Sequence, residues 1–280
     1  MPELPEVETI ARVLRDGNGE YQVSIIGCKI TDAKLLWART LAVPDPDVFF
    51  KEIIGQKVSA VTRRGKFLVF SLTHHTLLVH LRMSGDMRVE PAIDSKGNTK
   101  PFEKHDRLAL MLNGGNRMVF NDTRKFGRVW LVEDPEIVVG RLGPEPLQDG
   151  LSAGKFYGML QTHKRQLKPL LMDQRFLAGL GNIYTDEALH IARLHPLEHS
   201  NQLSLEEAGG LLAAIRQVLS EGIRRNGSSI DWVYRGGEYQ NHFSVYGRTG
   251  SPCPNCGALI ERLLVGQRGT HICPVCQRLG

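Results

Sequence analysis

The sequence predicts an α+β protein of several domains, and three observations lead to that fold class. Short apolar segments separated by turn residues fill the first half, and helical periodicity fills most of the second. Four of the five cysteines lie in the last 30 residues. With 280 residues and 41% hydrophobic residues, the chain can bury more than one core. We therefore expect an N-terminal β-sandwich or barrel preceded by a helix, then a helical domain, then a C-terminal zinc-binding hairpin.

Hydrophobic spacing in residues 1–135 predicts a helix and then a run of strands. Apolar residues at i, i+3, i+4 and i+7 predict a helix from Pro5 to Asp16, and a helical patch fits Asp47–Ile54. Short apolar segments bounded by Gly and Asn turns predict an antiparallel sheet domain. Its strands are expected at Val58–Arg63, Phe67–Leu72, Thr76–Leu81, Met87–Val89, Arg107–Leu112, Arg117–Asn121 and Arg128–Val132.

Residues 136–243 are expected to form the helical domain, and residues 244–280 the hairpin. The Gly- and Pro-rich stretch Gly140–Gly154 marks the boundary where the strand pattern stops. Ser204 begins a capping-box sequence for a long helix that runs to about Arg225. Three shorter helices are expected at Lys155–Thr162, Lys168–Gln174 and Ile183–Ile191.

The cysteines near the C-terminus have the spacing of a zinc site. Two Cys-x2-Cys pairs separated by a hairpin suit one tetrahedral zinc, whose four positions are then all filled by protein, so that the metal is structural. Two disulfides are the alternative, which a reducing cytosol disfavours. Arg268 lies midway between the pairs and is expected to project from the hairpin tip. The ligands are Cys253, Cys256, Cys273 and Cys276.

Charge and hydropathy narrow the class of partner. The formal net charge of +5 favours a polyanion only where basic residues cluster. They do so beside turns, in Arg63–Lys66, His80–Gly85 and Arg124–Arg128, each with apolar neighbours that a DNA-bending protein could insert into a base step. A solvated face is the alternative for any one cluster. The sequence has no apolar run of about 18 residues and no secretory pattern, so we expect a cytoplasmic protein without a membrane partner. We also expect a monomer, which would be nucleoid-associated if its polyanion is DNA.

The start of the chain offers an amine beside two carboxylates. If Met1 is removed, Pro2 carries a secondary amine with a pKa of about 8, which can attack a sugar carbon, and Glu3 and Glu6 lie next to it. Proline and acidic residues are also ordinary at the start of a helix, because proline lacks only a donor that has no partner there and carboxylates suit the helix dipole. Taken alone, the start of the chain favours that structural interpretation.

Several separated motifs occur in the order known from one family. Over nearly its whole length the sequence resembles bacterial formamidopyrimidine-DNA glycosylase. The resemblance implies an N-terminal β-sandwich, a helix-two-turn-helix domain and a zinc β-hairpin that grip damaged double-stranded DNA. The matching motifs are Pro2–Thr9, Arg64–Phe67, His80–Gly85, Asp122–Gly127, Gly181–Tyr184, Val245–Arg248 and Gln267–Thr270.

The resemblance also implies a mechanism. Pro2 attacks the sugar carbon that bears an oxidised purine, such as 8-oxoguanine or a formamidopyrimidine, and Glu3 protonates the sugar as its ring opens. Lys66 is implied in β-elimination and Arg268 in δ-elimination, so that one site acts as glycosylase and AP lyase. Glu6 orients the amine or the start of the helix.

The remaining roles concern DNA. The resemblance implies backbone contacts by His105, Arg124, Lys168 and Asn182, and His163 and Lys164 are further candidates beside them. The target base leaves the stack, and the gap is filled by Met83, Arg124 and Phe126. The segment Tyr234–His242 corresponds to a loop that covers the extruded base.

Two positions depart from the family pattern. Arg82 stands where the family usually has Gly, and Thr123 stands where it usually has Pro; both affect the expected shape of the loop more than its function. Two other functions stay open. An endonuclease VIII-like enzyme for oxidised pyrimidines usually has Gly at the position of Leu4, and a non-catalytic DNA-binding protein needs neither Pro2 nor Glu3.

Overall fold

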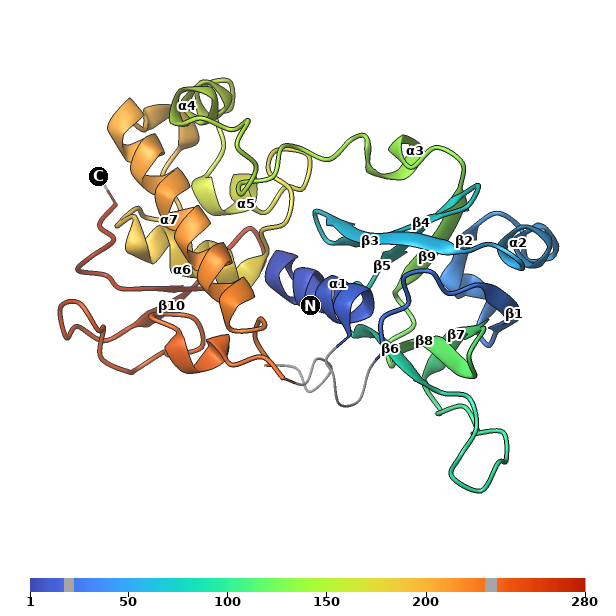
Figure 1. Cartoon of the computed structure of the whole chain (residues 1–280). Helices are drawn as coiled ribbons and strands as arrows, with labels where there is room; N and C mark the ends of the chain where they lie inside the picture. Colours follow the sequence, from blue (N-terminus) through green and yellow to red (C-terminus); the bar gives the residue numbers. More distant parts are fainter. Residues whose placement is uncertain (18–22, 230–235, 280) are drawn as a thin grey trace. The chain divides into compact units, whose positions relative to one another are not determined.

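The computed structural model describes residues 1–17, 23–229 and 236–279 (Figure 1). The described chain forms two compact units. The first contains Met1–Pro2 and Glu6–Arg141, and the second contains Glu3–Pro5, Leu142–Ser228 and the chain from Gly236. The mixture of helices and sheets confirms the predicted α+β class.

The first unit is a sandwich of two sheets with a helix against its core. The four-stranded sheet has the order β1-β7-β8-β6 and the five-stranded sheet the order β2-β9-β5-β4-β3. All neighbouring strands are antiparallel except β2 and β9. The strands are β1 (Ile30–Leu35), β2 (Leu41–Val43), β3 (Val58–Arg64), β4 (Phe67–Leu72), β5 (Thr76–His80), β6 (Gly85–Pro91), β7 (Asp106–Leu112), β8 (Asn116–Asp122) and β9 (Arg128–Val132).

The core of this unit lies between the two sheets. Phe70 of the five-stranded sheet and Phe120 of the four-stranded sheet belong to one buried cluster. Val7 and Leu14 join it from α1 (Leu4–Asp16), on the apolar stripe that the spacing predicted. The structure therefore has the sandwich rather than the barrel. The unit also contains η1 (Ala38–Thr40), α2 (Pro46–Ile53) and α3 (Glu136–Val139).

The predicted strands from Val58 onward are all present, with ends shifted by up to two residues. β1 lacks the alternation of buried and exposed side chains that would reveal a strand. Its pairing with β7 shifts register between Ile30 and Asp32, and this bulge changes which side chains face the core. Sequence analysis therefore set no bounds for it.

The second unit combines a helical domain with a small hairpin. Its helices are α4 (Ala153–Gln161), α5 (Leu167–Leu171), α6 (Asn182–Ile191) and α7 (Leu205–Arg224), with short η2 (Ser200–Gln202) and η3 (Tyr239–His242). The hairpin consists of β10 (Glu261–Val265) and β11 (Arg268–Ile272). The capping box at Ser204 and Glu207 is present as predicted, and α5 ends three residues before the predicted Gln174.

Helix α6 lies at the centre of this unit, because it packs against α5, α7 and β11. Every residue from Ile183 to His190 is buried, including the charged Asp186 and Glu187. Buried charges require specific partners, so α6 is where polar contacts concentrate. Among the residues described, none of the helices has the length and hydrophobicity that a membrane crossing requires.

The segment Tyr234–His242, predicted to cover an extruded base, lies partly outside the described residues. Its described part, from Gly236, includes η3. There the Tyr239 ring is buried and stacks on the Tyr184 ring, with centroids 5.2 Å apart. Tyr239 therefore belongs to the apolar core of the second unit.

Candidate functional site: a carboxylate cradle and two wedge loops

The carboxylate of Glu3 is held by the first backbone N–H groups of α6. Oε2 accepts from the amide of Gly181 at 2.6 Å and of Tyr184 at 3.5 Å, and Oε1 accepts from that of Ile183 at 2.9 Å. These donors have no partner inside the helix and carry the positive end of its dipole. Glu3 is only 2% exposed. The cradle thus stabilises a negative charge on a buried side chain that directly follows Pro2.

Gly181 is required by the closeness of this contact. A Cβ atom built at position 181 would lie 2.4 Å from Cδ of Glu3, far inside van der Waals contact. Any other residue would push the carboxylate off the helix. The glycine of the Gly181–Tyr184 motif therefore has a geometric reason.

Lys168 was predicted to contact the DNA backbone, and the structure places its ammonium inside the protein. The residue is 0% exposed, and Nζ donates to Oδ1 of Asp186 at 2.5 Å and to the Gly269 carbonyl at 3.2 Å. Burial lowers the pKa of Lys168, as does the charge of Arg268, against the opposing effects of Asp186 and Glu3. These charged groups therefore form one electrostatic cluster.

The same carbonyl of Gly269 accepts from Nδ2 of Asn182 at 3.1 Å. Two side chains from α5 and α6 thus hold the backbone directly after Arg268. The hairpin turn consists of Gly266 and Gln267, and Arg268 is the first residue of β11, paired with Val265 and exposed. The prediction that Arg268 projects at the hairpin tip is correct to within one residue.

The four C-terminal cysteines fit one zinc ion. Their Sγ atoms all lie within 4.8 Å of one another, with separations of 3.9 Å for the pair Cys253–Cys276 and 3.4 Å for Cys256–Cys273. A tetrahedron of Zn–S bonds of about 2.3 Å has edges of about 3.8 Å, whereas disulfide sulfurs lie about 2.05 Å apart. The site is therefore a structural zinc site, with all four positions filled by protein.

In the first unit, one carboxylate holds together the two loops that carry the predicted wedge residues. Oδ1 of Asp122 accepts from the Ser84 hydroxyl and from the Arg124 amide at 3.1 Å, and Oδ2 accepts from the Gly127 amide at 2.7 Å. Ser84 Oγ also accepts from the Arg124 amide at 3.0 Å. The loop before β6 and the loop after β8 are thus bonded to a single buried side chain.

The wedge side chains on the two loops that Asp122 joins are exposed. Met83 is 38% exposed and Phe126 is 49% exposed, although both are large and apolar. The Arg124 guanidinium lies 5.0 Å from the centroid of the Phe126 ring, within cation–π range. The structure therefore brings Arg124 and Phe126 together and leaves their outer faces accessible.

Arg82, at the first departure from the family pattern, has a φ of 55°, in the left-handed region that favours glycine. Its amide donates to Nδ1 of His80 at 3.0 Å. Burial, with the charges of Arg82 and Lys66, lowers the pKa of His80 to about 3, so His80 is neutral. Lys66 itself is 4% exposed and directly precedes β4, which pairs with β5 through Phe67 and His80.

The other predicted DNA contacts differ in exposure. His105 is half-buried, and its Nδ1 lies 3.2 Å from Nη2 of Arg107. His163 is also half-buried, and its Nδ1 lies 2.9 Å from the Met159 carbonyl near the end of α4. Lys164 is exposed. Pro2 and Glu6 are buried in the first unit.

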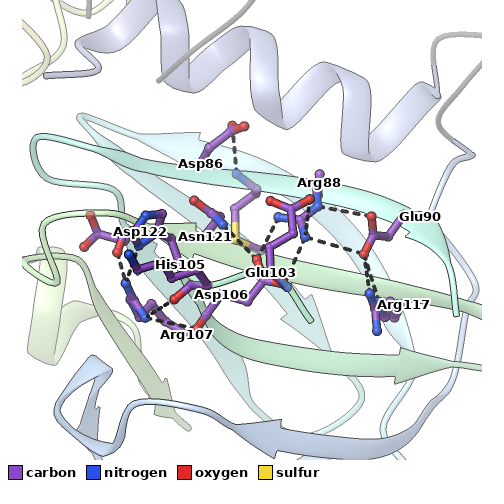
Figure 2. A network of polar contacts seen from close by, with 12 residues as sticks. Asp86, Arg88, Glu90, Glu103, His105, Asp106, Arg107, Arg117, Asn121 and Asp122 are labelled. Carbon is purple, nitrogen blue, oxygen red and sulfur yellow. Dashed lines mark hydrogen bonds and ion pairs between the residues drawn. The ribbon is translucent and has the colours of Figure 1, made fainter. Parts of the chain in front are cut away.

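Figure 2 shows a polar network on β6, β7 and β8, which also contains Asp122 and the predicted DNA contact His105. Arg88 bonds both oxygens of Asp106, at 2.9 and 3.0 Å, and contacts Glu90 at 3.2 Å. Arg117, which is 1% exposed, bonds Glu90 at 2.7 Å. Burial would raise the pKa of Glu90, but Lys100, Arg117 and Arg88 outweigh it and lower that pKa to about 2. These contacts of Arg88, Glu90, Asp106 and Arg117 join strands of the same sheet and involve none of Pro2, Glu3, Lys66 and Arg268, so this part of the network is structural.

Three family models match the chain in succession. Residues 1–129 match the formamidopyrimidine-DNA glycosylase N-terminal domain, residues 142–233 match its H2TH domain, and residues 250–279 match a zinc finger found in FPG and IleRS. A formamidopyrimidine-DNA glycosylase of Protochlamydia amoebophila is 43% identical over 287 residues, which cover 99% of this chain and 100% of that protein. The chain belongs to the formamidopyrimidine-DNA glycosylase family.

Other members of this family are similar along the full chain. The enzyme of Herpetosiphon aurantiacus is 41% identical over 99% of this chain and 100% of that protein. Two Lactococcus lactis structures each cover 99% of this chain and 100% of their own. One, a variant with Fapy-dG-containing DNA, has a TM-score of 0.89 at 36% identity. The other, bound non-covalently to DNA with an AP site, has a TM-score of 0.88 at 35% identity. These matches confirm the predicted family and its fold.

Sequence analysis missed the residues that hold this glycosylase site in place. Asp186 accepts from Lys168 and from the His271 amide, at 2.9 Å, and Glu187 accepts from the amides of Ser244, Val245 and Tyr246 at 2.8 to 2.9 Å. Burial raises the pKa of Glu187 even so. One signal could have found both: two adjacent acidic residues in a short helix that is otherwise mostly apolar.

Proposed function

We propose that this member of the formamidopyrimidine-DNA glycosylase family removes oxidised purines from double-stranded DNA with the Pro2 amine as nucleophile, and then nicks the strand by β,δ-elimination. Glu3, Lys66 and Arg268 are the proposed proton-transfer and elimination residues, and Glu6 supports the start of the chain. The proposal makes the chain a bifunctional glycosylase and AP lyase of base-excision repair.

The main support for this proposal is the set of hydrogen bonds that hold the Glu3 carboxylate at the start of α6. Simple DNA binding needs no carboxylate buried against three helix N–H groups beside a potential amine. The contacts favour the ionised form of Glu3, because hydrogen bonds to a carboxylate stabilise its charge. A carboxylate in that position must therefore gain a proton before it can donate one.

The adjacent amine can supply that proton. Near pH 7 a secondary amine with a pKa of about 8 is mostly protonated, so transfer from Pro2 to Glu3 creates the nucleophile and the acid together. The Pro2 nitrogen attacks the anomeric carbon, the bond from that carbon to the ring oxygen breaks, and Glu3 gives the proton to that oxygen. The proton that the attack leaves on the Pro2 nitrogen passes to the base, which departs with its bonding electrons, and the freed nitrogen lone pair then forms the iminium with the sugar carbon.

Elimination follows from the acidity of the sugar hydrogens next to the iminium. The 3′ phosphate leaves first, with Lys66 as the proposed base, and the 5′ phosphate leaves second, with Arg268 as the proposed participant. Lys168 and Asn182 both donate to the Gly269 carbonyl, and these two hydrogen bonds support a fixed position for Arg268.

For the DNA contacts, we propose that Met83, Arg124 and Phe126 enter the stack in place of the extruded base. Extrusion costs a few kcal/mol, which exposed apolar surface and a cation can offset. His105, His163, Lys164 and Asn182 remain the proposed backbone contacts. For Lys168, burial of the ammonium supports an indirect role through Gly269.

We further propose domain bounds at residues 1–135, 136–243 and 244–280. The break between the two compact units after Arg141, and the family-model bounds, support a division near the first of these positions. A chromosomal substrate supports association with the nucleoid.

Borohydride trapping tests the mechanism, because it reduces the iminium to a stable amine. The protein without Met1 is mixed with duplex DNA containing 8-oxoguanine, and a covalent complex is expected on a denaturing gel. The matched control retains Met1, which makes the Pro2 nitrogen an unreactive amide. Intact-mass measurement establishes which form is present, and absence of trapping by the processed form contradicts the mechanism.

The same assay separates the proposal from its nearest alternative. Duplexes with an oxidised purine or an oxidised pyrimidine are compared at equal enzyme concentration under single-turnover conditions. Faster excision of the purine is expected. Faster excision of the pyrimidine would instead assign the endonuclease VIII-like specificity.

A further inference from the structure

The last turn of α6 places a histidine against a zinc ligand. His190 is 1% exposed, and its Nε2 lies 3.4 Å from Sγ of Cys253. Nδ1 of the same ring is buried and has no hydrogen-bond partner among the residues that the structure describes. The contact to sulfur is therefore the polar contact that the described structure gives this ring.

Thiolates bound to zinc need hydrogen-bond donors. Four cysteinates around Zn²⁺ leave a net charge of about −2, which nearby N–H groups partly offset. Cys253 is 3% exposed, so water offers little help. One donor is the amide of Asn255, which lies between Cys253 and Cys256 and is 3.4 Å from Sγ of Cys253. The His190 ring places Nε2 at the same distance from this sulfur, from outside the zinc-binding segment.

The proton must lie on Nε2 for this contact to be attractive. A thiolate sulfur only accepts, so an unprotonated Nε2 would face it with a lone pair. Both the neutral Nε2–H tautomer and the imidazolium place a hydrogen there. The contact therefore holds whether or not the ring is charged.

We propose that His190 is a positioning residue for the zinc site, donating a hydrogen bond to the Cys253 thiolate and thereby slowing the loss of zinc. The partner group is the zinc tetrathiolate of this chain. The inference does not depend on the catalytic mechanism proposed above.

The position of His190 on α6 gives this bond a second consequence. Asp186 and Glu187 of the same helix hold β11 and residues 244–246, and its first N–H groups hold Glu3. The zinc site is thus bonded to the helix that cradles the catalytic carboxylate. Loss of the His190 contact at the C-terminal end of α6 should affect zinc retention more than it affects the position of Glu3 at the N-terminal end.

The test measures zinc release from the full-length zinc-loaded protein to a chromogenic chelator. His190→Phe keeps a planar ring of similar size and removes the donor. We expect it to release zinc about tenfold faster, since loss of such outer contacts typically lowers metal affinity by about 10- to 100-fold. Alkylation followed by peptide mass spectrometry should show Cys253 modified sooner than in the unsubstituted protein.

Two controls separate the bond from general destabilisation. His190→Gln has an amide nitrogen that can reach the place of Nε2, and its release rate should return to within about twofold of the unsubstituted protein. Leu189→Ala removes a buried side chain from the same turn and leaves the His190 ring in place. Unchanged release from His190→Phe, no rescue by His190→Gln, or equally fast release from Leu189→Ala at a matched melting temperature would each overturn the proposal.

Discussion

The two units bury charge in different ways. In the first unit the ion pairs of the buried Asp106 and Arg117 with the half-buried Arg88 and Glu90 hold strands together, and the wedge residues are exposed on loops. In the second unit the buried charges of Glu3, Lys168 and Asp186 are predicted site residues or their direct partners. Removing a charge of the ion-pair network should therefore lower the stability of the first unit without changing the reaction on DNA. Removing a buried charge of the second unit should change both.

The largest effect is expected from Glu3→Gln. An amide cannot shuttle the proton, so single-turnover excision of 8-oxoguanine should slow by about 10²- to 10⁴-fold. The amide NH₂ also faces an N–H donor of α6, which should loosen the cradle. Strand cleavage at a preformed abasic site, which needs no base departure, is the control and should fall much less. Unchanged excision would remove Glu3 from the mechanism.

Substitutions at one buried ion pair in each unit give the sharpest comparison. Asp186→Asn leaves the Lys168 ammonium without its bonded carboxylate and should cost about 3 to 5 kcal/mol of unfolding free energy. It should also release Gly269, so products at an abasic site should shift from β,δ- toward β-elimination. Glu90→Gln should cost about 3 kcal/mol, because it leaves the buried Arg117 without its carboxylate partner, whereas Arg88 keeps Asp106.

Denaturant unfolding and product analysis on gels, below the melting temperature of both variants, make this comparison. Glu90→Gln should leave the ratio of β to β,δ products unchanged. A product shift as large as that of Asp186→Asn would show that the two units do not differ in this way.

His80 gives the first unit a pH dependence. Its pKa is lowered from 6.5 to about 3, so below pH 6.5 the unfolded chain binds a proton that the folded protein does not. The unfolding free energy should therefore decrease as the pH is lowered, by up to about 1.4 kcal/mol per pH unit and by about 2 kcal/mol from pH 7.5 to pH 5. His80→Asn, whose amide oxygen can still accept from Arg82, should lack this slope.

Denaturation curves of both proteins across this range provide the measurement. Asp86 acts in the opposite direction, because burial raises its pKa to about 6 and its contribution is lost as pH rises. It is present in both proteins, so their difference isolates His80. Parallel curves would contradict a neutral, buried His80.

The smallest effect concerns the left-handed backbone at Arg82. Arg82→Gly and Arg82→Ala both remove the side chain, but only glycine adopts a φ of 55° without strain. The glycine variant should be more stable than the alanine variant by about 1 kcal/mol. Thermal unfolding measures the difference, and equal stability of the two variants would show that the loop relaxes at no cost.

Local patterns predicted the strands from Val58 onward, the helices other than α3 and the short η1 to η3, and the zinc ligands, because each depends on residues close together in sequence. The supporting contacts could not be predicted in this way. Asp122 bonds Ser84 across 38 residues, and Lys168 bonds Gly269 across 101. Periodicity carries no information about such pairs. The burial of Lys168 was missed for the same reason, since a lysine beside other basic residues looks like a surface residue until its partner Asp186 is known.

The contact between Glu3 and α6 joins residues 178 to 181 positions apart. During synthesis the first residues of the chain therefore emerge long before the helix end that holds their carboxylate. A nascent or truncated chain that stops before residue 184 has the amine but no cradle for its acid. The proposed cleavage of DNA should thus require synthesis of the chain at least as far as the start of α6.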